Sequence, residues 1–413
     1  MKFLSRSWVL VILGAAVSVL LLKLFMALTT AGSLDVAGFT DHLVKIREFG
    51  GIGAYHNVGK FGNPFNHPPF MIHVISAMGY MADRTGLPFS FWLRLPATLA
   101  DIGSLLLVWK ILERSRQLRL EPKTLLLMVL CPASIMISGY HGNTDAVMIL
   151  FLLAAVYIID TTDRGWLAGV AFGMALNIKV APLIFIPVMF FYLGSLKQRL
   201  HFFGAAFMVF LVGSMPYIVQ DPGVISRIVF GYGSLYGNWG WTWFAKLWTH
   251  VPVAADDNSY RPEGVHATIA TVGKYLMLVV ILVLSWRMNR SRPKPPLFFQ
   301  YGVIGFIFLA LTPGFGAQYF AWVVPFVVAL GFWPTVLFYI TSGVYLLMDY
   351  GCFAYASNQY SFCADKRPLF YVGVVCWYSV FAILMFYRGA LKRRDFNLNK
   401  APTPDQLLTQ TSM

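Results

Sequence analysis

The sequence is poor in charge and in cysteine. Only 12% of its 413 residues are Asp, Glu, Lys or Arg, whereas an average soluble domain carries about 25%. Because 58% of the residues are hydrophobic, the composition excludes a soluble cytosolic enzyme and a disordered chain. Four cysteines are too few for a disulfide framework, although Cys352 and Cys363 could pair in an oxidising compartment.

Two kinds of motif are also missing. No Walker loop and no G-x-G-x-x-G sequence opens a βα unit, which excludes a nucleotide-binding domain of either type. No pair of acids and no His-rich spacing has the pattern of a metal site. We therefore expect no metal and no cofactor.

The sequence has instead a series of apolar stretches, some long enough to cross a membrane as helices of about 20 residues. Shorter ones, broken by Pro, Gly or Asn, can span where neighbouring helices cover them. The long stretches are 8–30, 91–112, 201–219, 264–285, 333–350 and 369–387; the short ones are 124–139, 146–160, 165–177, 180–194, 297–312 and 319–331. We predict an all-α polytopic membrane protein with about twelve transmembrane helices in a single domain, residues 1–387.

The distribution of basic residues predicts the topology. If 68–82 is a short helix on the outer surface or re-entering it, the cytoplasmic segments collect 18 of the 32 Lys and Arg residues. The large outer loops 31–90 and 220–263 are longer but hold only four and three. This asymmetry follows the positive-inside rule. We expect a multi-pass protein of the plasma (inner) membrane with both termini cytoplasmic and 388–413 a basic, disordered tail.

The formal charge of +14 is then mainly a consequence of topology. In a soluble protein the same charge would favour nucleic-acid binding. We expect no nucleic-acid partner.

Conspicuous polar residues gather on the predicted outer side. Ionisable groups near membrane depth are expensive and by default indicate function. An outward-facing polar cavity roofed by the two large loops is the simplest arrangement that unites them. The residues are Asp35, Asp41, Asn66, His67, His141, Asn143, Asp145, Lys179, Gln318 and Tyr319.

Several of these residues also have a purely structural interpretation. Asp145 could cap the helix that it begins, and Lys179 could extend to the headgroups. Arg94 and Asp101, seven residues apart on one helical face, could form a buried pair.

Five short motifs, taken in order, resemble those of the GT-C superfamily of polytopic glycosyltransferases. The order is most similar to bacterial polyprenol-phosphate-mannose α-mannosyltransferases (GT87-like) and more distantly to GPI mannosyltransferase I. The resemblance covers residues 8–330, but His67 stands where many relatives have Tyr, and Asp35 is single rather than part of an acidic pair. The motifs are Asp35…Tyr55…Asn66-His67-Pro68-Pro69-Phe70, Arg94…Asp101, Gly139-Tyr140-His141-Gly142-Asn143-Thr144-Asp145, Asn177-x-Lys179-x-x-Pro182 and Gln318-Tyr319-Phe320-Ala321-Trp322…Pro325.

The resemblance implies a GT-C-like fold and an inverting hexosyltransferase. A hexose, mannose by resemblance alone rather than glucose or arabinose, would pass from a polyprenyl-phosphate donor to a hydroxyl acceptor outside the cytoplasm. The acceptor could be a glycolipid, a glycan or a protein. Inversion needs a carboxylate that takes the acceptor's proton. Asp35 is the first candidate for this base, and Asp41 the second, although Asp41 could equally be a solvated loop acid.

The remaining residues are assigned by the same resemblance. Lys179, His141 and His67 would stabilise the leaving phosphate, whose negative charge grows as the bond breaks. The lipid tail would lie near Trp241 and Trp243, which could alternatively belong to an interfacial aromatic belt. The candidate substrate-binding residues are Asn66, Asn143, Asp145, Gln318, Tyr319, Trp241 and Trp243.

Two other classes of function compete with this one. A secondary transporter or flippase commonly has repeats related across the membrane, with broken helices at the midplane. The sequence has no visible repeat between its halves, and its polar residues lie near one face. A structural or assembly subunit would not need Asp35 and Lys179 to face one cavity.

Overall fold

The computed structural model describes residues 4–56, 65–231, 234–237, 239–249, 262–353 and 367–393, and these are almost entirely helical. Within this part of the chain, six helical stretches are long and apolar enough to cross a membrane: α1 (Arg6–Thr29), α4 (Phe89–Arg114), Pro122–His141, α10 (Leu196–Ile218), α13 (Gly264–Arg290) and Pro368–Leu391. The all-α membrane prediction is confirmed.

All twelve predicted apolar segments are helical over most of their length. The shorter segments are divided because proline cannot continue a helix yet suits a first turn, as at Pro132, Pro182 and Pro325. The divided and shorter elements are α5 (Pro122–Val129), α6 (Pro132–Ser134), the π-helix η1 (Ile135–His141), α7 (Asp145–Thr161), α8 (Gly165–Ile178), η2 (Ala181–Phe185), α9 (Ile186–Tyr192), α14 (Leu297–Leu311), η4 (Ala317–Trp322), α15 (Val324–Val327) and η5 (Val328–Leu330).

The last two helices continue beyond the apolar stretches that predicted them. Helix α16 spans Phe332–Phe353 and α17 spans Arg367–Arg393. The first residues of the predicted tail 388–413 are therefore helical, and residues 394–413 lie outside the described residues. The possible pairing of Cys352 with Cys363 is outside what the structure describes, since neither side chain is described.

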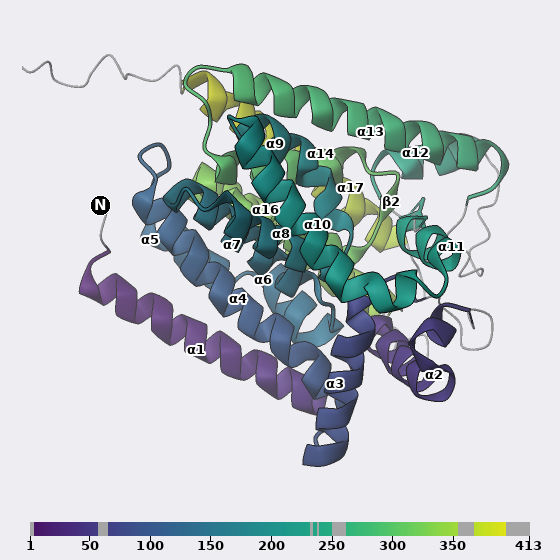
Figure 1. Ribbon diagram of the computed structural model, residues 1–413. Coiled ribbons are helices and arrows are strands. Elements are labelled where there is room, and N and C mark those ends of the chain that lie inside the picture. Colours follow the sequence, from purple (N-terminus) through teal and green to yellow (C-terminus); the bar gives the residue numbers. More distant parts are fainter. Residues whose placement is uncertain are drawn as a thin grey trace, which may run out of the picture.

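One end of the helical bundle carries several short elements and the less apolar helix α2. In Figure 1, α2 (Leu34–His56), α11 (Pro222–Ile225) and α12 (Trp241–Thr249) gather on the right, whereas α1 begins on the left. We call the end with α2 the loop end. It also carries α3 (Phe70–Thr85), the π-helix η3 (Ser226–Phe230), and strands β1 (Leu235–Tyr236) and β2 (Gly314–Phe315), which pair antiparallel.

Helix α3 matches the short helix predicted over 68–82. It begins directly after Pro68-Pro69 and ends at Thr85, where Gly86 takes the left-handed conformation that commonly closes a helix. Helix α2 was expected only as part of a loop. It buries Val36, Phe39 and Leu43, which are spaced at three and four residues and form one helical face.

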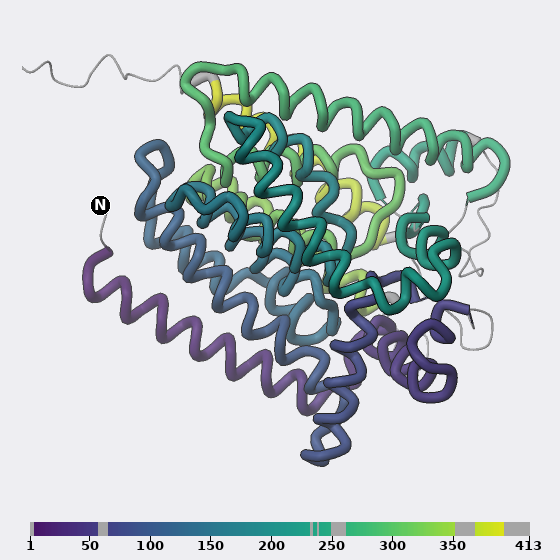
Figure 2. Tube along the Cα trace, viewed as in Figure 1, coloured from purple at the N-terminus to yellow at the C-terminus, as the bar shows by residue number. Residues whose placement is uncertain are grey.

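The bundle is packed most closely where α8 meets α10. A Cβ added to Gly169 would lie 2.2 Å from the carbonyl oxygen of Phe202, and one added to Gly173 would lie 2.6 Å from that of Ala206. Small residues at this spacing let two helix backbones approach inside a membrane. The trace in Figure 2 shows the neighbouring pair α1 and α4, which are also in contact.

The expected pair between Arg94 and Asp101 is wrong. The Arg94 guanidinium donates to backbone oxygens at the end of α1 (Met26, 2.9 Å; Thr30, 2.8 Å) and to that of Gly139 (3.3 Å). It therefore holds the C-terminal carbonyls of α1, where a cation is favoured. Asp101 instead contacts Lys23 on α1.

Candidate functional site

Asp35 lies at the centre of a polar cluster at the loop end. It occupies the first turn of α2, and about a third of its side chain (35%) is exposed. Its Oδ2 accepts a hydrogen bond of 2.7 Å from Asn143 Nδ2 and lies 3.0 Å from Nε2 of His141. The cluster joins the start of α2, the η1–α7 turn, the end of α8 and η4.

The electrostatic surroundings keep Asp35 ionised. Burial by itself raises the pKa of Asp35, but His141 through charge and hydrogen bonding, Asn143 through its hydrogen bond and the charge of Lys179 together outweigh it. The pKa therefore lies well below its usual range. A carboxylate that is ionised and partly exposed can accept a proton or a hydrogen bond from a hydroxyl group.

His141 is fixed from three sides. Ser33 donates to its carbonyl oxygen (2.9 Å), and the same hydroxyl lies 2.7 Å from Nδ1, so that Nδ1 is the donor in this contact. The imidazole stacks on Tyr350 with ring centroids 5.2 Å apart and an angle of 16°. Nε2 is consequently directed to Asp35, and His141 contacts the candidate base directly.

The turn after His141 depends on Gly142. Its φ of +78° is a conformation that L side chains rarely adopt, and a Cβ there would lie 2.4 Å from Val36 Cγ2 on α2. Glycine therefore ends η1 and lets the following residues pass close to α2. This approach brings Asn143 within reach of Asp35.

Asp145 is completely buried and holds two other residues of the cluster. Its carboxylate accepts from Lys179 Nζ at 3.0 Å and from Trp322 Nε1 at 3.0 Å. Asp145 therefore has no exposed atom for a substrate, and its role in the structure is to orient Lys179 and Trp322. It does not cap α7, whose N-cap is Thr144 without a side-chain hydrogen bond.

Lys179 lies just past the end of α8, with 14% of its side chain exposed. Its ammonium group lies 5.6 Å from the ring centroid of Tyr319 and 5.8 Å from that of Trp322. Aromatic faces at this distance attract a cation. Lys179 thus points into the cluster that contains Asp35 rather than out to solvent.

His67 is buried beside the same cluster and is neutral at pH 7. Burial and the charge of Lys179 lower the pKa of His67 to about 4, against the opposing effects of Asp35 and a hydrogen bond with the Ile178 backbone. It can bind a ligand through a hydrogen bond but not through positive charge. Burial, together with the electrostatic interactions with His67 and Lys45, likewise lowers the pKa of His42 to about 3.

Other predicted residues lie apart from Asp35. Asp41 is exposed on α2 and acts electrostatically on Lys45. Trp241 donates to the Leu311 carbonyl oxygen (3.0 Å), and Trp243 packs on Phe370 of α17 at 4.3 Å.

Asn66 and Gln318 are partly exposed neighbours of clustered residues. Asn66 precedes His67, whose carbonyl oxygen accepts from Tyr55 at 2.6 Å. Gln318 precedes Tyr319, which is buried.

Three residues of the site were missed by the sequence analysis. Ser33 contacts His141, Tyr350 stacks on it, and Asp349 lies close enough to act electrostatically on both Asp35 and His141. Asp349 and Tyr350 lie at the end of an apolar stretch. An acid beside a tyrosine at that position is the sequence feature that could have indicated a site residue. Among the described residues, no group of three or more His, Cys, Asp or Glu side chains is arranged to hold a metal ion.

Comparison with known proteins identifies the family. The sequence matches the model of Glycosyltransferase family 87 over residues 65–313. It is 21% identical to GPI mannosyltransferase 1 of Candida albicans (strain SC5314 / ATCC MYA-2876) over an alignment of 285 residues that covers 63% of this chain and 68% of that protein.

Two solved structures are also similar. ArnT from Cupriavidus metallidurans bound to undecaprenyl phosphate matches with a TM-score of 0.47 and 14% identity, over 94% of this chain and 79% of that chain. Its apo state gives 0.45 and 14%, over 94% and 78%. The family match confirms the resemblance to GT-C glycosyltransferases. Since that match covers more than half of the chain, this multi-pass membrane protein belongs to glycosyltransferase family 87.

Proposed function

We propose that this glycosyltransferase transfers mannose from a polyprenyl-phosphate donor to a hydroxyl acceptor outside the cytoplasm. The configuration at the anomeric carbon is inverted in the transfer. One observation carries the proposal: an ionised, partly exposed carboxylate, Asp35, and a cation, Lys179, belong to one cluster at the loop end. Inverting transfer needs a base and a group that stabilises the leaving phosphate. These two residues have the required charges.

The reaction that follows is a single displacement. Asp35 takes the proton of the acceptor hydroxyl as that oxygen forms a bond to the anomeric carbon of the sugar. The bond from the anomeric carbon to the phosphate oxygen breaks on the opposite side, and polyprenyl phosphate leaves with the additional negative charge. Lys179 stabilises this charge. Neutral His67 donates its one N–H to the Ile178 backbone, so its free Nδ1 accepts a hydrogen bond from a substrate hydroxyl group. His141 and Asn143 hold Asp35 in its ionised form.

Unsatisfied polar atoms support a polar ligand at this place. Nδ1 of His67 and the hydroxyl oxygen of Thr144 are buried without a hydrogen-bond partner. Buried polar groups normally have partners, so each exception needs an explanation. Sugar hydroxyls and phosphate oxygens would supply the missing ones. Asn66, Gln318 and Tyr319 border the same cluster as candidate sugar contacts.

The donor and its sugar are inferred from two features. Exposed apolar side chains cover the spans that would face lipid, including Leu21 on α1, Phe207 on α10 and Leu276 on α13. A donor carried by a lipid tail can reach such a bundle from within the bilayer, with Trp241 and Trp243 as the candidate tail contacts. The name of the fungal relative, GPI mannosyltransferase 1, supports mannose.

The positions of the basic segments support an orientation of the protein in the membrane. The start of α1, the α4–α5 connection and the α13–α14 connection lie on the side of the bundle away from α2 (Figure 1). These segments are rich in Lys and Arg, which favours the cytoplasmic side. We infer that both termini are cytoplasmic, that the plasma membrane holds the protein, and that residues 1–387 work as one domain.

The test is transfer of radiolabelled mannose from a polyprenyl-phosphate donor by purified protein in liposomes, with a membrane extract supplying acceptors. Asp35→Asn should lower transfer by about 10²–10⁴-fold, the usual contribution of a general base. Asp41→Asn is the matched control, because Asp41 is exposed on the same helix, and should keep wild-type transfer. Full activity of Asp35→Asn would exclude Asp35 as the base.

A further inference from the structure

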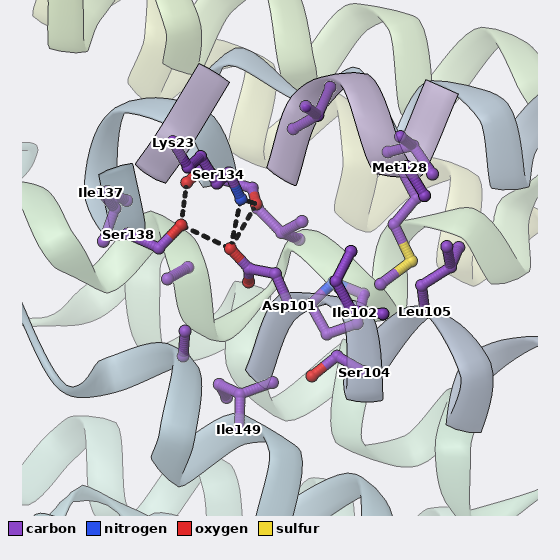
Figure 3. Close-up of a pocket in the computed structure, with 17 residues that line it drawn as sticks. Lys23, Asp101, Ile102, Ser104, Leu105, Met128, Ser134, Ile137, Ser138 and Ile149 are labelled. Atoms are coloured by element: carbon purple, nitrogen blue, oxygen red, sulfur yellow. Dashed lines mark hydrogen bonds and ion pairs between the residues drawn. The ribbon is translucent and has the colours of Figure 1, made fainter. Parts of the chain in front are cut away.

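A charged network with a buried lysine and a partly exposed aspartate, Asp101 (23% of its side chain), lies inside the bundle, away from Asp35. Lys23 on α1 is 2% exposed, and its ammonium group contacts Oδ2 of Asp101 (2.5 Å) and the hydroxyl of Ser134 (2.9 Å). The same carboxylate oxygen accepts from the hydroxyls of Ser134 and Ser138 (Figure 3). Charges at this depth are expensive and rare. Their presence therefore calls for an explanation beyond packing.

The two serines connect this network to an unusual helix. Ser138 lies within the π-helix η1, and Ser134 directly precedes it. The closing bond from Gly142 N to the Ile137 oxygen spans five residues, as π winding requires. π-helical segments are rare and often occur at functional sites. The Ser138 hydroxyl also lies 2.7 Å from the Ser134 carbonyl oxygen, so that its one hydrogen is shared between that oxygen and Asp101 and links the winding to Asp101.

Side chains of α4 also form hydrogen bonds with the backbone of η1 toward its C-terminal end. Thr98 on α4 donates to the Ser138 oxygen at 3.5 Å, and Arg94 donates to the Gly139 oxygen at 3.3 Å. Two residues later the helix ends at His141, whose Nε2 lies 3.0 Å from Asp35. Side chains of α1 and α4 thus contact the chain from Ser134 to Gly139, two residues before the residue that contacts the candidate base.

A small cavity adjoins the network. Its volume is about 40 Å³, which is enough for water. Asp101 and Ser104 line it from α4, and Ala321 and Pro325 line it from the segment that contains Trp322. The Ser104 hydroxyl is buried without a partner.

We propose that Lys23, Asp101, Ser134 and Ser138 are positioning residues that fix the π winding of η1 and thereby set His141 against Asp35. The alternative is that they only stabilise the fold. The two differ in one respect. Replacing an ion pair inside a protein by apolar residues is often neutral or stabilising, but here it removes the carboxylate that accepts from both serine hydroxyls and leaves Ser138 only the Ser134 carbonyl oxygen. The catalytic part of the proposal rests on the proposed function, whereas the structural part does not.

The test is the double variant Lys23→Met/Asp101→Leu, measured in three ways. Its thermal unfolding temperature in detergent should match or exceed that of the wild type, because no unpaired charge remains. Amide hydrogen exchange over residues 135–142 should be faster, because the winding is no longer held. Transfer should fall by about 10²-fold, as a displacement of about 1 Å at a catalytic group can produce.

The matched control is Lys110→Met/Glu113→Gln. It removes an ion pair of 2.9 Å near the C-terminal end of α4, the helix that also carries Asp101. It should leave exchange over residues 135–142 and transfer unchanged. If the Lys23→Met/Asp101→Leu protein exchanges over 135–142 like the wild type, the positioning role is refuted.

Two further outcomes remain decisive. If the double variant does not fold, Ser138→Ala takes its place, since it removes one hydrogen-bond donor without leaving a charge; wild-type exchange over 135–142 in that variant also overturns the proposal. If exchange rises as expected but the wild-type protein transfers no mannose, the winding role holds and the proposed function fails.

Discussion

Asn143 donates a hydrogen bond of 2.7 Å to Asp35, although the two residues are 108 positions apart in the sequence. The contact exists because Gly142 lets the chain after η1 pass against Val36 of α2. A neutral donor at this position stabilises the charged carboxylate without pairing with it as a salt bridge would. The Asn143 amide therefore contributes to the low pKa of Asp35 while part of the carboxylate stays exposed.

Removing this donor should change the pH dependence of transfer. In Asn143→Ala the charged form of Asp35 loses a hydrogen bond, so its pKa rises toward the ordinary value. The acidic limb of the kcat/KM profile should therefore move to higher pH. Asn143→Asp should move it further, because a second carboxylate opposes ionisation. The measurement is initial transfer rate against pH for all three proteins.

The control for this series is Asp41→Asn, whose acidic limb should coincide with that of the wild type. An acidic limb that stays in place in both Asn143 variants would mean that another group titrates. Asp349, which acts electrostatically on Asp35, would then be the next residue to replace.

Asp145 should contribute strongly to stability, because its pair with Lys179 is buried. In Asp145→Asn the Lys179 ammonium loses its carboxylate, and breaking a buried pair costs about 3–5 kcal/mol of unfolding free energy. The control is Asp83→Asn, which breaks the Arg47–Asp83 pair of 2.6 Å between exposed side chains. Exposed pairs contribute only about 0–1 kcal/mol. Unfolding in detergent should separate the two variants, and equal shifts would contradict a structural role for Asp145.

The spans could be predicted from the sequence because each depends on local composition. A run of about 20 apolar residues needs no tertiary information to be recognised as a span, and the breaks at Pro132 and Pro182 are visible in the same way. Helix α2 was not predicted, since charged residues interrupt its apolar positions. The spacing of Val36, Phe39 and Leu43 did contain the helical signal.

The sequence predicted the site only for residues that could be recognised as neighbours from the side of the membrane on which they lie. Assigning Asp35, His141 and Lys179 to one face anticipated that they would be neighbours. The partner of Asp101 was not predictable, because spacing along α4 suggested Arg94 while packing of α1 against α4 supplies Lys23. Ser33 belongs to no motif, and its role depends on how η1 ends.

The close contact between α8 and α10 gives a test of the membrane fold itself. Gly173→Ala would place a Cβ 2.6 Å from the Ala206 carbonyl oxygen, so one backbone must move. Overpacking of this kind costs about 1–3 kcal/mol, and the unfolding temperature should fall. Gly165→Ala on the same helix is the control, since its nearest neighbour would be an ordinary 3.8 Å away. A Gly173→Ala protein as stable as Gly165→Ala would mean that the helices pack differently.

His67 should make the protein less stable in mild acid. Its pKa is about 4 in the folded state and about 6.5 in an unfolded chain. Between these values the unfolded state binds the proton and the folded state does not, so stability falls as pH drops from about 6.5 to about 4. A difference of this size corresponds to about 3 kcal/mol. Above about pH 6.5 both states are neutral and His67 contributes no pH dependence.

The variant that isolates this effect is His67→Gln, which retains a hydrogen-bond donor but cannot titrate. Unfolding temperatures in detergent at pH 7.5 and pH 4.5 should differ less for His67→Gln than for the wild type, because one of the protons taken up on unfolding is gone. His56→Gln serves as the control, since its half-exposed ring on α2 is paired with Asp221 at 3.3 Å and is not buried. If the wild type and His67→Gln lose stability in parallel, the pKa of His67 is not lowered in the folded protein and its burial has no effect on the acid stability.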